Sequence, residues 1–352
     1  MIVPRSLRRS ARRSRRPAAA ALLAAALLLS GCGPAGADGL GESGAHDDRP
    51  VVLTTFTVLA DIVSQIGGDR VEVRSITPVG TEIHEYDPTP GDIRAATEAD
   101  LVITNGLGLE AWFDQFIDHA EAPSTIASAD VDPLPVTRLA GHPAAAEDLP
   151  TNPHAWLSPE RGRTYVDVVE QALAELSPAD SEVFAAHADS YRERLTEIAE
   201  DARTRLAAVE ESTGSPAQVV TCEGAFSYLA EDLGLEEHYL WPINSDTEGT
   251  PQQVEAQIEH VRAHEVPTVF CETTVNDDAQ RQVAEASGAT LGKPLHVDSL
   301  SAPDGPVPSY LELLRHDLDL IISGAEAGVE ESSESQDNTE DDADDDADEE
   351  DR

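Results

Sequence analysis

The sequence predicts an α/β protein of two Rossmann-like lobes with parallel sheets, joined by one long rigid α-helix. Three observations support this prediction. The chain has 352 residues, which is too many for one hydrophobic core. Strand-like apolar runs alternate with helical patterns in two separate regions, 51–177 and 214–325. Between these regions, residues 178–213 keep a helical apolar spacing and contain no glycine.

The first lobe, residues 51–177, is expected to follow a strand–helix order from its start. Its first six residues, VVLTTF, form a strand-like apolar run, and the next residues place apolar side chains at helical spacing. The prediction for this lobe is, in order, strand 51–56, helix 57–68, strand 71–80, helix 91–100, strand 101–108 and helix 109–120. This alternation favours parallel strands with helices on the faces of the sheet.

The same order restarts in the second lobe, residues 214–325, after the linking helix 178–213. At 1.5 Å per residue this helix would span roughly 50 Å, and it would act as a stiff spine. One helix of the second lobe is expected to begin at Thr250-Pro251, with Gln253 at the position that a capping box requires. The predicted strands of this lobe are 217–222, 238–243, 267–271 and 290–297.

Residues 1–31 are expected to be a signal peptide and not part of the fold. A basic segment precedes the apolar run 18–29, whose twelve residues are too few to span a bilayer, which takes about twenty. The signal ends in the sequence LSGC, which resembles the lipobox of bacterial lipoproteins. The resemblance implies cleavage before Cys32 and lipidation of its sulfur, which would anchor the protein to the cell membrane outside the cytoplasm. A soluble secreted protein is the alternative, and Sec and twin-arginine export both stay open.

The two ends of the mature chain are polar. Residues 32–50 are expected to be a lipidated Cys32 followed by a flexible tether, and residues 326–352 an acidic disordered tail. The tail is interpreted as a solvated solubility segment, with a weak collector of cations as the alternative. The formal net charge of the chain is −45. Such a surface repels nucleic acid and anionic lipid, so neither is an expected partner.

Two cysteines remain beyond Cys32, namely Cys222 and Cys271. An even pair outside the cell membrane favours a disulfide, which would close a loop of about fifty residues and stabilise the fold by roughly 4 kcal/mol. Two buried free thiols are the alternative.

Four residues of the types that bind metals follow predicted strands or lie in turns: His84, His154, Glu223 and Asp298. In open α/β sheets, ligands bind beyond the carboxyl ends of the strands. Two imidazoles would come from the first lobe and two carboxylates from the second. Each residue alone is more often a cap or a solvated group. Together they predict a metal site in the crevice between the lobes.

Six separated motifs point to a known family. In chain order they are TPVGTEIHEYDPTPGDI, ADLVITNGLGLEAWF, NPHAWLSP, CEGAFSYLA, INSDTEGTP and HVDSLS. They resemble the metal-binding solute receptors, the substrate-binding lipoproteins of bacterial manganese/zinc ABC importers, over nearly all of both lobes. The resemblance implies that His84, His154 and Asp298 bind the metal, with Glu223 as the remaining ligand.

The ligand types indicate which metal is carried. In the resembling family, manganese-type receptors carry Glu at the position of Glu223, and zinc receptors often carry His. Oxygen-rich sites of higher coordination suit Mn²⁺, whereas Zn²⁺ favours four N/S ligands in a tetrahedron. The Irving–Williams order still allows Zn²⁺ to compete. The sequence therefore predicts Mn²⁺ as the transported ligand, with Fe²⁺ as a further candidate and a zinc receptor of the same family as the alternative.

The resemblance implies that the receptor delivers its ion to an ABC permease with an accompanying ATPase, and a monomer is expected. An enzyme is not expected, because four protein ligands leave little room for a substrate. A surface adhesin or structural lipoprotein is the alternative from a different class. If the imidazoles bind the ion, affinity should fall as the pH drops through roughly 6.5, because ligation needs neutral imidazoles.

Overall fold

The computed structural model describes residues 48–113, 122–137, 139, 149–244 and 249–344. The predicted signal peptide and Cys32 lie outside these residues. Every helix in the described part of the chain is too short or too polar to cross a bilayer.

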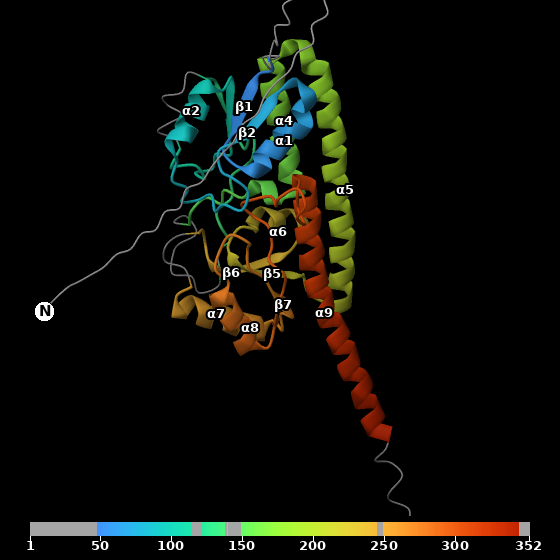
Figure 1. Ribbon diagram of the computed structural model, residues 1–352. Helices are drawn as coiled ribbons and strands as arrows, with labels where there is room; N and C mark the ends of the chain where they lie inside the picture. The colour runs from blue at the N-terminus through green and yellow to red at the C-terminus, as the bar shows by residue number, and fades with distance from the viewer. Residues whose placement is uncertain (1–47, 114–121, 138, 140–148, 245–248, 345–352) are drawn as a thin grey trace, which may run out of the picture. The chain divides into compact units, whose positions relative to one another are not determined.

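The first lobe contains a four-stranded parallel sheet (Figure 1). The strands, in the spatial order β2-β1-β3-β4, are β1 (Val51–Thr54), β2 (Glu72–Ser75), β3 (Leu101–Thr104) and β4 (Ser124–Ile126). Its helices are α1 (Thr57–Gly67), α2 (Pro90–Glu98) and α4 (Pro159–Leu176). In Figure 1, α2 lies on one side of β1 and β2, with α1 and α4 on the other. The predicted parallel α/β lobe is confirmed, with β4 as an additional edge strand.

The helix expected at 109–120 is absent from its described part, residues 109–113, which form a turn. Gly106, Leu107 and Gly108 have φ angles of 83°, 55° and 86°, so these three residues leave β3 in a conformation outside the right-handed helical region. The buried carboxylate of Glu110 accepts hydrogen bonds from the backbone N–H groups of Asn105 and Gly106. A side chain therefore organises this loop, and residues 114–121 lie outside the described part.

The second lobe is also built from parallel strands. They are β5 (Gln218–Glu223), β6 (Glu236–Trp241), β7 (Thr268–Val269) and β8 (Thr290–Leu291), and β5 pairs with β6 and β7 with β8. The N–H of Phe270 donates to the C=O of Val220 at 2.8 Å and joins β7 to β5. The helices are α6 (Ser227–Leu233), α7 (Pro251–Ala263) and α8 (Asp278–Ser287). Strands β7 and β8 are shorter than predicted, and their pairing resumes beyond Pro294 with a parallel bridge between Glu272 and Leu295.

Helix α5 (Ser181–Thr213) confirms the predicted long linking helix. It packs on α1, α4, α6 and α9, and Figure 1 shows it running beside both lobes. The largest hydrophobic core takes residues from both lobes and from α5, for example Val52, Phe184 and Val219. Because closely packed cores resist deformation, this shared core fixes one lobe against the other.

Helix α9 (Tyr310–Asp344) continues into the acidic segment that was predicted to be disordered. Its first turns are held by the buried side chains of Leu311, Leu314 and Ile321. Once packing has stabilised these turns, no new helix nucleus is needed, and each further residue adds one backbone hydrogen bond. The prediction of disorder was wrong for residues 326–344, and residues 345–352 lie outside the described part.

Replacing Thr250 with alanine is expected to lower the free energy of unfolding by about 1 kcal/mol. The N–H of Gln253 donates to Oγ1 of Thr250 at 3.4 Å and the N–H of Thr250 donates to Oε1 of Gln253 at 2.7 Å, which is the predicted capping box of α7. Urea denaturation would measure the change. The control is Thr204→Ala in α5, whose hydroxyl donates only to the C=O of Glu200. An equal loss in both variants would contradict the capping role.

Candidate metal centre

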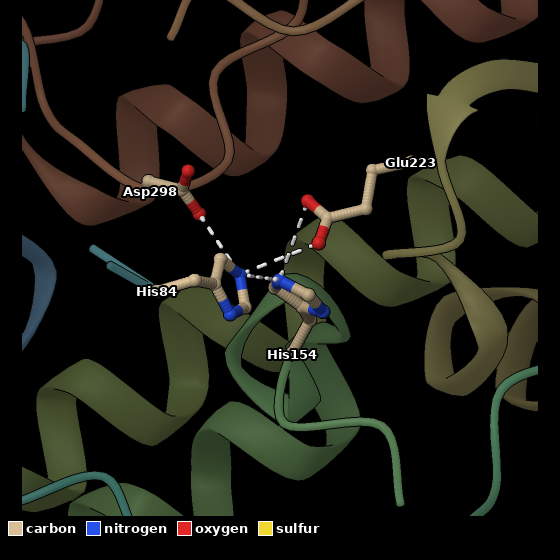
Figure 2. Close-up of side chains that lie close together, drawn as sticks. All are labelled: His84, His154, Glu223 and Asp298. Carbon is tan, nitrogen blue, oxygen red and sulfur yellow. Dashed lines mark hydrogen bonds and ion pairs between the residues drawn. The ribbon is translucent and has the colours of Figure 1, made fainter. Parts of the chain in front are cut away.

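His84, His154, Glu223 and Asp298 converge on one point between the two lobes (Figure 2). Each offers one ligand-type atom, and these four atoms lie within 4.8 Å of one another. Two donors on opposite sides of one ion, with bonds of about 2.1 Å, would lie about 4.2 Å apart. The cluster is therefore close to the size that a single transition-metal ion requires. The structure brings together all four residues proposed from the sequence.

Each of the four residues lies at the end of a strand or in a loop. Glu223 is the last residue of β5, and His84 lies in the loop between β2 and α2. His154 directly precedes a short 3₁₀ turn, Ala155–Leu157, which leads into α4. Asp298 lies between β8 and α9. Because such loops gather at the carboxyl edges of parallel sheets, residues far apart in sequence meet here.

Both imidazoles present Nε2 to the carboxylates of the second lobe. Nε2 of His84 lies 3.1 Å from Nε2 of His154, 3.3 Å from Oε1 of Glu223 and 3.9 Å from Oδ1 of Asp298. Nε2 of His154 lies 3.6 Å from Oε2 of Glu223. Two ring nitrogens at this separation can both reach one ion through bonds of about 2.0–2.1 Å.

Burial sets the charge state of the cluster. The side chain of His84 is 7% exposed and the other three are 0% exposed. Burial lowers the pKa of His84 to about 4 and that of His154 well below its usual value. Burial, aided by the charge of Glu82, raises the pKa of Asp298 to about 8. Burial and the nearby Asp298 also hold the pKa of Glu223 well above its usual value. Burial thus favours the neutral form of each of the four side chains in the metal-free site, and an entering dication displaces the proton of Asp298.

Two oxygens of the site have no hydrogen-bond partner in the described part of the chain, Oε2 of Glu223 and Oδ1 of Asp298. The other oxygen of each carboxyl group accepts a hydrogen bond. The N–H of Asn244 donates to Oε1 of Glu223 at 2.8 Å, and the hydroxyl of Thr274 donates to Oδ2 of Asp298 at 3.0 Å. A buried polar atom without a partner costs about 1–3 kcal/mol. A divalent cation between these oxygens would remove that cost, so the residues fit a metal ion.

The residues that position Glu223 and Asp298 were not predicted from the sequence. Besides Asn244 and Thr274, the buried Glu272 accepts a hydrogen bond from the N–H of Glu223 at 3.3 Å. These three residues follow strands β6 and β7, at the same sheet edge as Glu223. The rule that directed attention to strand exits would have found them if it had been applied to polar residues in general.

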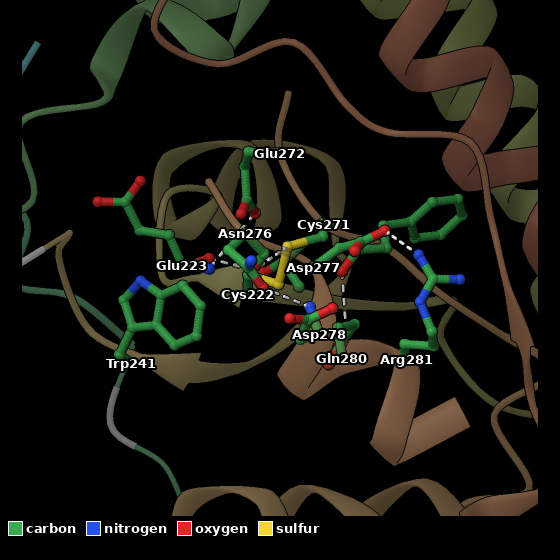
Figure 3. The surroundings of a disulfide bond; sticks show 12 residues. Cys222, Glu223, Trp241, Cys271, Glu272, Asn276, Asp277, Asp278, Gln280 and Arg281 are labelled. Carbon is green, nitrogen blue, oxygen red and sulfur yellow. Dashed lines mark hydrogen bonds and ion pairs between the residues drawn. A yellow bond between two sulfur atoms is a disulfide. The ribbon is translucent and has the colours of Figure 1, made fainter. Parts of the chain in front are cut away.

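The structure pairs Cys222 with Cys271 in a disulfide, as the sequence suggested (Figure 3). Cys222 directly precedes Glu223, and Cys271 directly precedes Glu272. Figure 3 shows the bond joining the two neighbouring chain segments beside Glu223. The disulfide therefore fixes the spacing of two strand ends, one of which carries a candidate ligand.

The affinity of this site for Mn²⁺ is expected to rise with pH between 6 and 8, by up to about tenfold per pH unit for each proton displaced. Below its pKa of about 8, Asp298 holds a proton that the metal must displace. The imidazoles do not titrate in this window because the pKa of His84 is about 4 and that of His154 is also lowered. These buried imidazoles are therefore not expected to give the midpoint near 6.5 that free imidazoles would give.

Calorimetry at pH 6, 7 and 8 in buffers of different ionisation heat would measure both the affinity and the protons released. A constant affinity without proton release would contradict the expectation. The metal-free protein provides a second readout. A raised pKa means that the folded protein holds more protons than the unfolded chain, so the free energy of unfolding should decrease as the pH rises from about 6.5 to 8. His84, with its lowered pKa, acts in the opposite direction only between about 4 and 6.5. Saturation with Mn²⁺ should reduce the decrease.

Comparison with known proteins matches residues 52–324 to the family described as zinc-uptake complex component A, periplasmic. The iron-binding protein YfeA of Yersinia pestis is 42% identical over 277 residues, which cover 78% of this chain and 85% of YfeA. The manganese ABC transporter substrate-binding lipoprotein PsaA of Streptococcus pneumoniae is 31% identical over 287 residues, 80% of this chain and 91% of PsaA. The Mn-bound periplasmic metal binding protein of Candidatus Liberibacter asiaticus has a TM-score of 0.71 at 33% identity, covering 79% of this chain and 100% of that one.

The fold and the buried four-residue site define a substrate-binding protein of a metal ABC importer. Within that class, the chain belongs to the family of zinc-uptake complex component A, ZnuA. The family resemblance and the fold class predicted from the sequence are therefore confirmed. The family is named for zinc, whereas the two relatives are named for iron and manganese.

Proposed function

We propose that this protein is an extracytoplasmic, lipid-anchored receptor that binds Mn²⁺ and delivers it to an ABC permease driven by an ATPase. The observation that carries the proposal is the buried cluster of His84, His154, Glu223 and Asp298, in which one oxygen of each carboxylate lacks a partner in the described part of the chain. Side chains that are 0–7% exposed admit a bare ion and exclude an organic substrate. The proposed role is therefore transport and not catalysis.

The donor set favours Mn²⁺. Two imidazoles and two carboxylates supply four donors, or up to six when the carboxylates bind through both oxygens. Such oxygen-rich sites suit Mn²⁺ better than the tetrahedral preference of Zn²⁺. Two relatives named for manganese support this choice, while the 42% identical YfeA is named for iron and supports Fe²⁺ as a competing cargo. Zn²⁺ should also bind in vitro, because the Irving–Williams order gives Zn²⁺ a higher affinity than Mn²⁺ or Fe²⁺ for the same ligands.

The membrane anchor is proposed from the sequence. Cys32 follows a signal-type segment and lies outside the described residues. Several relatives are named as lipoproteins of ABC transporters, which supports lipidation of Cys32 and a partner permease. We also propose that the receptor acts as a monomer, because all four ligands come from one chain.

Metal analysis of the protein purified from its host under anaerobic conditions tests the cargo. We expect Mn²⁺ at about one ion per chain, and a deletion strain should need added Mn²⁺ for growth in metal-depleted medium. Zn²⁺ as the bound ion, with growth restored only by Zn²⁺, would favour the zinc receptor. Normal growth of the deletion strain in depleted medium would favour an adhesin or structural lipoprotein.

A further inference from the structure

Asn152 lies two residues before His154 and is fully buried, and no role was predicted for it from the sequence. Its backbone is fixed at both ends. The N–H donates to the C=O of Leu134 at 2.8 Å, and the C=O accepts a hydrogen bond from the hydroxyl of Tyr228 at 2.9 Å. The side-chain amide therefore starts from a fixed position.

The orientation of the amide follows from neighbours that can only donate or only accept. The backbone N–H of His154 can only donate, and it lies 3.0 Å from Oδ1 of Asn152. The C=O of Gly224 can only accept, and it lies 2.8 Å from Nδ2 of Asn152. Oδ1 is therefore the atom that faces His154, and Nδ2 is the atom that faces Gly224.

This orientation determines which ring nitrogen of His154 carries the proton. Nδ1 of His154 lies 2.8 Å from Oδ1 of Asn152. Because an amide oxygen can only accept, Nδ1 must carry the proton, and the neutral ring keeps a bare lone pair on Nε2. Nε2 is the atom that faces His84 and Glu223. A free neutral imidazole favours the opposite tautomer, with the proton on Nε2, which cannot bind a metal through that atom.

The other end of the amide reaches the second lobe. Nδ2 of Asn152 donates to the C=O of Gly224, the residue after Glu223, and to the hydroxyl oxygen of Ser227 at 2.9 Å. Ser227 is the first residue of α6. One side chain thus contacts a candidate ligand of the first lobe and the segment that carries a candidate ligand of the second.

We propose that Asn152 is a positioning residue that holds His154 in the metal-binding tautomer and ties this imidazole to the segment carrying Glu223. The effect on metal affinity rests on the proposed function, whereas the tautomer exists without metal. Partners of this kind typically change metal affinity by about 10–100-fold when they are removed.

Two variants test the proposal. Asn152→Ala removes both contacts, whereas Asn152→Asp keeps an oxygen that accepts from Nδ1 of His154 and loses the donors to Gly224 and Ser227. NMR of metal-free protein labelled with ¹⁵N-histidine reports the tautomer at pH 7.5, and calorimetry reports Mn²⁺ affinity. In the wild type and in Asn152→Asp we expect the proton of His154 on Nδ1. In Asn152→Ala the proton should shift toward Nε2, with an affinity about 10–100-fold lower. Asn152→Asp should bind more tightly than Asn152→Ala.

Gln257 provides a matched control. It is fully buried, its Nε2 donates to the C=O of Thr221 at 2.9 Å, and its Oε1 accepts from Nδ1 of His238, a histidine outside the site. Gln257→Ala should change the signals of His238 and leave both the tautomer of His154 and the Mn²⁺ affinity unchanged.

Three results would overturn the proposal. They are a wild-type His154 protonated on Nε2, an Asn152→Ala variant with unchanged tautomer and affinity, and a loss of affinity in that variant without a change of tautomer. If Asn152→Ala does not fold, the tautomer of His154 in the wild type and in Asn152→Asp still tests the proposal. A wild-type protein that does not bind Mn²⁺ would refute the proposed function, and the tautomer measurement would remain decisive for Asn152.

Discussion

Replacing Glu223 with glutamine is expected to weaken Mn²⁺ binding by at least about 100-fold, the upper end of the range for residues that only surround a metal. Glutamine keeps the shape of the side chain and an oxygen that can accept from the N–H of Asn244. It removes the negative charge, and an amide replaces the carboxylate oxygen that has no partner in the described part of the chain. Calorimetry or competition with a fluorescent chelator would measure the loss.

The control for this variant is Asp61→Asn. Asp61 is a largely buried carboxylate in α1 that accepts from the N–H of Tyr310 at 2.9 Å and from the hydroxyl of Tyr191, away from the four candidate ligands. This variant should lose stability and keep its affinity for Mn²⁺. Glu223→Gln should show the reverse, with an unfolding midpoint of the metal-free protein no lower than that of the wild type. Wild-type affinity in Glu223→Gln would exclude Glu223 as a ligand.

Removing the disulfide, with Cys222→Ala and Cys271→Ala together, is expected to lower the free energy of unfolding by about 4 kcal/mol. The bond joins two residues that are 49 positions apart in sequence. Removing the bond gives the unfolded chain more conformations. Alanine is chosen because both cysteines are buried and alanine adds no polar group there. Guanidinium denaturation of the metal-free variant would measure the change.

Wild-type protein treated with reductant provides the matched control and should lose a similar amount of stability. Mn²⁺ at about 1,000 times its dissociation constant stabilises the folded state by about 4 kcal/mol. Saturating Mn²⁺ should therefore return the variant to roughly the stability of the metal-free wild type. A variant that unfolds at the same denaturant concentration as the wild type, both without metal, would show that the disulfide does not stabilise the fold.

Local sequence patterns predicted most of the architecture correctly. Strand β1 and helix α1 were predicted from apolar spacing, and the start of α7 from the capping residues Thr250 and Gln253. These features depend on residues that are close in sequence, so a short stretch of the chain is enough to predict them. The long helix α5 was predicted for the same reason, because no glycine interrupts its apolar spacing.

The predictions that failed depend on contacts between distant segments. Glu110 is buried in the turn 109–113 and accepts a hydrogen bond from the hydroxyl of Thr55, which lies just after β1. The acidic part of α9 is helical because the first turns of that helix pack on the core. The pH midpoint near 6.5 that free imidazoles would give is not expected here, because burial lowers the pKa of His84 and raises that of Asp298. No local pattern contains these burial effects.

The sequence by itself determined the two parallel α/β lobes, the helix that links them, and the types and order of the four candidate ligands, because strands, helices and motifs are local properties of the chain. Only the tertiary structure decided that His84, His154, Glu223 and Asp298 lie within 4.8 Å of one another, which of their oxygens lack partners in the described part of the chain, and how burial changes their protonation. It also placed Asn152 between His154 and Gly224. Distances and desolvation are set by how the lobes pack together, and packing brings side chains together regardless of their separation in sequence.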